Sequence, residues 1–99
     1  MTERTSWNDL RSQRMSEPGA DEAYEAAKLA FELGAAVRTL REEKGWSQNQ
    51  LAKVASMTQS AVARFEAGGT VPTLPVLQRI AKALDANLTV QVTPHANVA

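Results

Sequence analysis

The sequence contains no cysteine and a single histidine, His95. The absence of cysteine excludes disulfides, thiolate zinc sites and cysteine nucleophiles. One histidine near the end of the chain forms neither a metal-ligand cluster nor a Ser–His pair, so we expect no enzyme activity, no metal and no cofactor. The apolar runs are far shorter than a membrane span, and the first residues lack a signal-peptide core. These absences favour a cytoplasmic protein with no membrane partner.

The sequence also lacks net charge, because 11 basic and 11 acidic side chains balance over its 99 residues. Taken alone, this balance argues against a nucleic-acid partner. It is an average over unlike parts, since residues 1–37 carry a net charge of −3, residues 38–82 carry +4 and residues 83–99 carry −1. This asymmetry indicates separate partners for separate segments, and ordinary scatter of solvated charge is the alternative interpretation.

The N-terminal arm, residues 1–20, contains a short helical pattern at 6–15, and Pro18 and Gly19 then mark a turn. A helix of this length is too short to be stable alone. Two interpretations are open: the arm folds back onto the apolar side of the following helix, or it binds a partner protein. The apolar residues that would carry either contact are Trp7, Leu10, Met15, Tyr24 and Phe31.

Residues 21–44 have the apolar spacing of a long helix, and Gly45 is placed to end it. Ser47 and Gln50 then form a capping box, which predicts that a second helix begins here and runs to about Ala55. A tight connection follows the second helix. The sequence therefore predicts a long helix at residues 21–44, followed by a short helix that ends at about Ala55.

Thr58 is the predicted cap of a third helix, which Gly68 and Gly69 end. Thr73 is the predicted cap of a fourth helix, with a proline tolerated in its first turn. The fourth helix has an apolar stripe that we expect to be buried, made of Leu74, Leu77, Ile80, Ala81 and Leu84.

Residues 87–93 change to a period of two, with Leu88, Val90 and Val92 alternating with polar residues, which predicts a β-strand. No other segment has a strand pattern, so the backbone of this one needs a partner from outside the monomer. We prefer pairing with the same strand of a second subunit, in a homodimer, over a frayed tail. The expected fold is all-α with an N-terminal helical extension and one C-terminal β-strand, divided into residues 1–20, 21–86 and 87–99.

The second and third predicted helices form a helix-turn-helix unit, in which the later helix enters the major groove of DNA. On a helical wheel, residues 58–67 place Val62 and Phe65 on one side and short polar or small residues on the other. Glutamine can read adenine, arginine can fork onto guanine, and alanine can meet a thymine methyl group. The residues expected to face the bases are Gln59, Ser60, Ala63 and Arg64.

Phosphate contacts would hold this helix in register on DNA. Gln48 lies in the first turn of the second helix and Thr58 caps the third, where backbone N–H groups are available to phosphate oxygens. Thr70, just beyond the third helix, is a further candidate.

Residues 33–84 resemble the XRE-type, lambda-repressor-like helix-turn-helix family, above all in the stretch LREEKGWSQNQLAKVASMTQSAVARFEAG. The resemblance implies a five-helix-type DNA-binding domain in which Gln48 contacts phosphate. It also implies that Arg41 pairs with Glu66, bracing the long helix against the third helix. We interpret this pair as structural and expect Arg41 to lend a charge to DNA phosphate. Gln59, Ser60 and Arg64 would contact bases, as the wheel indicates.

Three residues depart from the pattern of that family. Ser56 stands where the family usually has glycine, which would cost about 1 kcal/mol if the turn needs a positive φ. Gly69 replaces a common basic residue and Ala67 replaces a frequent polar one. These departures lower the expected affinity for DNA and leave the resemblance intact.

The flanking segments resemble HigA-type antitoxins, which are repressors that also neutralise a partner toxin, commonly an mRNA-cleaving RNase. We therefore expect a sequence-specific transcriptional repressor that binds a near-palindromic operator in double-stranded DNA as a homodimer. Two hypotheses remain open at this point. The protein is the antitoxin of a toxin–antitoxin pair that autoregulates its operon, or it is a stand-alone phage-like or metabolic regulator without a toxin partner.

Overall fold

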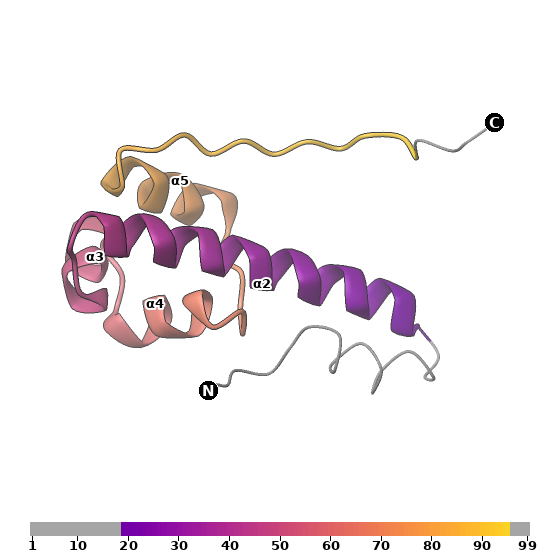
Figure 1. Cartoon of the computed structure of the whole chain (residues 1–99), viewed down its shortest axis with the longest axis horizontal. Coiled ribbons are helices and arrows are strands. Elements are labelled where there is room, and N and C mark those ends of the chain that lie inside the picture. The colour runs from indigo at the N-terminus through magenta and orange to yellow at the C-terminus, as the bar shows by residue number, and fades with distance from the viewer. Residues whose placement is uncertain (1–18, 96–99) are drawn as a thin grey trace.

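The computed structural model describes residues 19–95, which form four helices around one apolar core. The long helix α2 lies between the two shorter helices α4 and α5, and α3 closes the end of the molecule where α2 finishes (Figure 1). Helix α3 contacts both α4 and α5, and α4 also contacts α2. The helices are α2 (Ala20–Glu43), α3 (Gln48–Ala55), α4 (Gln59–Glu66) and α5 (Leu74–Ala83).

Helix α2 ends as the sequence predicts, at a glycine with left-handed backbone. Gly45 has a φ of 74°, and its N–H donates to the carbonyl of Glu42 at 2.9 Å. The N–H of Trp46 donates to the carbonyl of Arg41 at 3.2 Å. These two bonds satisfy carbonyls that the helix itself leaves open, and they turn the chain sharply into α3.

The predicted caps of the two short helices are confirmed. Ser47 Oγ accepts from the N–H of Gln50 at 3.1 Å, and Gln50 Oε1 accepts from the N–H of Ser47 at 2.7 Å. Thr58 Oγ1 accepts from the N–H of Ala61 at 3.1 Å. Thr73 stands at the start of α5 without such a bond. Local side-chain chemistry therefore places the starts of α3 and α4 directly.

The core lies where α2, α3, α4 and α5 meet. Its largest fully buried side chains, all less than 2% exposed, are Phe65, Leu51, Ile80 and Val62. The expectation that Leu74 is buried with the rest of its stripe is wrong, since this side chain is 57% exposed. Leu74 is the first residue of α5, so its side chain falls at the edge of the helix packing, whereas Leu77 and Leu84 lie within it.

Two polar contacts hold α5 against the rest of the domain. Arg79 Nε donates to the carbonyl of Ala55 at 3.0 Å, joining α5 to the last residue of α3. Lys44 Nζ lies 2.8 Å from Asp85 Oδ2, which links the segment after α2 to the segment after α5. These contacts hold α5 to the end of α3 and to the segment that follows α2.

The predicted C-terminal strand is wrong. Residues 87–95 form neither strand nor helix, and Figure 1 shows them as an extended trace beyond α5. The reason is that alternation places side chains on two sides but cannot supply backbone partners, and residues 19–95 contain no second strand. Leu88 packs against the core, while Val90 and Val92 are 63% and 97% exposed.

The predicted 6–15 helix, with Trp7, Leu10 and Met15, lies outside the described residues. The two aromatic residues proposed as its dock lie on α2, where Tyr24 is half-buried and Phe31 is 37% exposed. Across residues 19–95, no helix combines the length and apolar character that crossing a bilayer requires.

The turn between α3 and α4 contains the strain anticipated from the sequence. Ser56 adopts left-handed backbone, with φ 59° and ψ 48°. Because a Cβ is disfavoured there, we expect Ser56→Gly to raise the free energy of unfolding by about 0.5–1 kcal/mol. Urea denaturation followed by circular dichroism measures this change. Thr39→Gly, placed in the regular part of α2, is the control and should lower stability; a loss in both variants would contradict strain at Ser56.

Candidate nucleic-acid interface

Helix α4 presents two distinct faces. Val62 and Phe65 are each 1% exposed and face the core. The opposite face is open, with Gln59, Ser60 and Arg64 exposed and the small Ala63 half-buried beside them. The outward face therefore carries hydrogen-bonding side chains with a small residue between them. This spacing allows the helix to approach the floor of a DNA groove.

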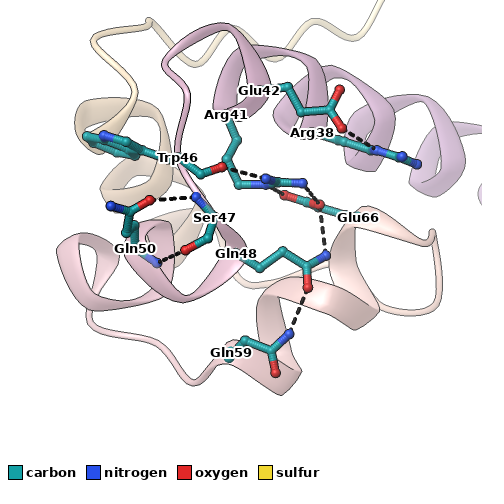
Figure 2. Close-up of polar contacts among 9 residues, drawn as sticks. All are labelled: Arg38, Arg41, Glu42, Trp46, Ser47, Gln48, Gln50, Gln59 and Glu66. Atoms are coloured by element: carbon teal, nitrogen blue, oxygen red, sulfur yellow. Dashed lines mark hydrogen bonds and ion pairs between the residues drawn. The ribbon is translucent and has the colours of Figure 1, made fainter.

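A chain of hydrogen bonds connects this face to the interior of the domain (Figure 2). Gln59 Nε2 donates to Gln48 Oε1 at 2.7 Å. Gln48 Nε2 in turn donates to Glu66 Oε1 at 3.1 Å. The side chain of Gln59 is therefore held by a residue of α3, and its own Oε1 is not used in this contact.

The chain ends at a buried ion pair between α2 and α4. Arg41 Nε donates to Glu66 Oε2 at 2.7 Å and Arg41 Nη2 donates to Glu66 Oε1 at 3.0 Å. The two side chains are 10% and 3% exposed. The hydrogen bond to Glu66 raises the pKa of the Arg41 guanidinium above its ordinary value, and this outweighs the opposing effect of burial. The pair is thus a bidentate, charge-assisted brace between the two helices.

Arg41 also donates from Nη1 to the carbonyl of Trp46 at 2.7 Å. All three nitrogens of its guanidinium therefore bind protein atoms. A contact between Arg41 and DNA phosphate stays a prediction, and it would use the second N–H of Nη1 or Nη2, which these three bonds leave over.

Two of the other predicted phosphate ligands lie at the starts of helices. Gln48 is the first residue of α3, and Thr58 caps α4. The first N–H groups of a helix lack partners within the helix, so both ends can donate to an anion. Thr70 is exposed in the loop after α4.

A polar hollow opens beside the outward face of α4, between α2, α3 and α4. It has a volume of about 260 Å³. The residues that line it are Arg38, Arg41, Gln48, Ala63, Glu66 and Ala67.

Within residues 19–95, no group of three or more His, Asp or Glu side chains is arranged to hold a metal ion.

The sequence alone did not identify two parts of this site. One is the bond between Gln48 and Glu66, which joins residues predicted to act separately. The other is Arg38, which lies one helical turn before Arg41 on α2 and lines the same hollow. The spacing of these two arginines along a helix is the signal that could have found Arg38.

Comparison with curated proteins finds a relative that is similar in sequence. The competence pilus inhibition repressor of Acinetobacter baylyi is 33% identical over 58 residues, which is 59% of this chain and 53% of that protein. The chain therefore spans about half the length of this curated relative.

Three solved structures are similar to the domain. The clp gene regulator ClgR from C. glutamicum matches with a TM-score of 0.59 and 28% identity, over 61% of this chain and 77% of that one. The restriction-modification controller protein C.AhdI from Aeromonas hydrophila matches with a TM-score of 0.57 and 33% identity, over 59% and 88% of the two chains. A structure of a HipA–HipB–O2–O3 complex contains a chain that matches with a TM-score of 0.55 and 28% identity, over 66% and 92%.

The match to a family model covers more than half of the sequence. Residues 32–91 match the model described as a helix-turn-helix domain, and this range includes α3, the turn at Ser56 and α4. The chain belongs to the helix-turn-helix domain family.

Proposed function

We propose that this protein is a sequence-specific transcriptional repressor whose α4 reads the major groove of double-stranded DNA. The observation that carries the proposal is the outward face of α4, on which Gln59 is held by Gln48 while Ser60 and Arg64 are exposed. Groups fixed before binding lose little conformational freedom on contact with bases. Occupation of a promoter is sufficient for repression, so the proposal needs no catalytic residue, metal or cofactor.

The protein is proposed to bind as a homodimer to a near-palindromic operator. Two recognition helices would enter successive major grooves about 34 Å apart on one side of the duplex. A single α4 offers few base-reading side chains, so two copies increase both affinity and site length. Analytical ultracentrifugation with and without operator DNA tests this; a monomer on a single half-site would contradict it.

The base-reading role of α4 is tested by Arg64→Ala. Because arginine forks onto guanine, we expect a loss of about 1–3 kcal/mol in binding to the operator and a smaller loss on DNA of random sequence. Gel shifts on the promoter of the gene itself measure both. Lys82→Ala, which removes a charge from α5, is the control. Equal losses on the two DNAs would contradict base reading by Arg64.

The finer proposal is that the repressor is an antitoxin that autoregulates its operon and neutralises an RNase toxin. The acidic residues 1–37 and the similarity to a chain of the HipA–HipB–O2–O3 complex support it. The similarity to a competence pilus inhibition repressor favours the alternative, a regulator without a toxin. A neighbouring reading frame that arrests growth when expressed alone, and is neutralised by this protein, would decide for the antitoxin; a gene with no such neighbour would decide against it.

A further inference from the structure

A second ion pair lies on the surface of α2 and includes Arg38, one of the residues that line the polar hollow. Arg38 Nε lies 3.1 Å from Glu42 Oε2, one helical turn further along α2. The two side chains are 62% and 55% exposed, and Figure 2 shows them beside the buried Arg41–Glu66 pair. Arg38 lines the hollow, as do Ala63 and Ala67 of α4. The pair therefore lies beside the helix proposed to enter the groove.

The two arginines of the hollow differ in how firmly their charges are held. Arg41 is bound at every guanidinium nitrogen, and the carboxylate of Glu66 accepts from both Arg41 and Gln48. Arg38 is held in the pair with Glu42, where water has access to both side chains. An exposed pair of this kind contributes at most about 1 kcal/mol, so a stronger anion can displace the carboxylate.

We propose that Arg38 binds a backbone phosphate of DNA at the mouth of this hollow, and that Glu42 competes with the phosphate for Arg38. This inference rests on the proposed DNA-binding function, because α4 must lie in the groove to bring a strand past α2. The small side chains of Ala63 and Ala67 leave room there for the sugar–phosphate backbone. Glu42 then lowers DNA affinity in two ways: its carboxylate holds the guanidinium of Arg38, and it repels the phosphate.

The two charges predict opposite effects on binding. Arg38→Ala should weaken binding about threefold to tenfold per protomer and reduce the slope of log affinity against log salt by about 1 for each protomer bound. Glu42→Gln should tighten binding about twofold to fivefold, because the competing charge is gone while the shape is kept. Both effects should be similar on operator and on random DNA, since phosphates carry no sequence information.

The experiment uses the full chain with a 30-base-pair duplex of random sequence and with the promoter of the gene, titrated by fluorescence anisotropy at several salt concentrations. Lys82→Ala and Glu43→Gln change the same charges elsewhere and are the matched controls. Thermal melts check that each variant is folded, and Arg38→Lys, which keeps the charge, should retain most of the binding.

The outcomes separate this inference from the proposed function. If wild type binds neither DNA, the proposed function is wrong. If wild type binds and Arg38→Ala behaves as Lys82→Ala does, Arg38 has no phosphate contact. If Glu42→Gln does no more than Glu43→Gln, the competition between carboxylate and phosphate is overturned.

Discussion

Replacing Glu66 with alanine is expected to lower the free energy of unfolding by about 3–5 kcal/mol. The substitution leaves the guanidinium of Arg41, whose side chain is 10% exposed, without the carboxylate that neutralises it. It also removes the acceptor of Gln48 Nε2. A loss of this size is a large fraction of the total stability of a small domain, about 5–15 kcal/mol, so the unfolding transition in urea should shift strongly.

A double variant separates the charge from the packing at this position. Arg41→Met with Glu66→Leu removes both charges and keeps apolar volume, so most of the lost stability should return. DNA affinity should not return with it, because Gln48 still lacks the partner that positions it next to Gln59. A double variant as unstable as Glu66→Ala would contradict the unpaired charge as the cause, and one with full DNA affinity would contradict the positioning of Gln48.

Replacing Gly34 with alanine is expected to lower the free energy of unfolding by about 3 kcal/mol, although alanine is the better helix former by about 1 kcal/mol. Gly34 is buried where α2 crosses α4. A Cβ at this position would overlap the carbonyl oxygen of Phe65 and lie 3.1 Å from that of Glu66. Both obstacles are backbone atoms, so α2 and α4 must move apart and loosen the core around Phe65.

The neighbouring residue gives a control for this prediction. Ala35 is exposed on the same helix, so Ala35→Gly should cost only the propensity difference, about 1 kcal/mol. Denaturation of both variants, followed by circular dichroism, compares the two positions. Gly34→Ala at or above wild-type stability would show that the helices can separate at little cost, which would contradict the close crossing as a constraint.

Sequence reasoning predicted the helix ends well where the signal is local. The caps at Ser47 and Thr58, and the glycine after α2, act through atoms within a few residues, so the sequence alone predicts them. The two faces of α4 could also be predicted, because a helix fixes the angle between successive side chains. The alternation at residues 87–93 was misleading, because a strand also needs a partner that no local pattern supplies.

The sequence by itself determined that this protein has a helix-turn-helix unit and which residues of α4 face outward. It did so because helix caps and helical periodicity act over a few residues of the chain. Only the tertiary structure decided that Gln59, Gln48, Glu66 and Arg41 form one connected chain. These contacts join residues up to 25 positions apart, and their existence depends on how closely α2, α3 and α4 cross. The same crossing requires glycine at 34 and creates the hollow beside Arg38.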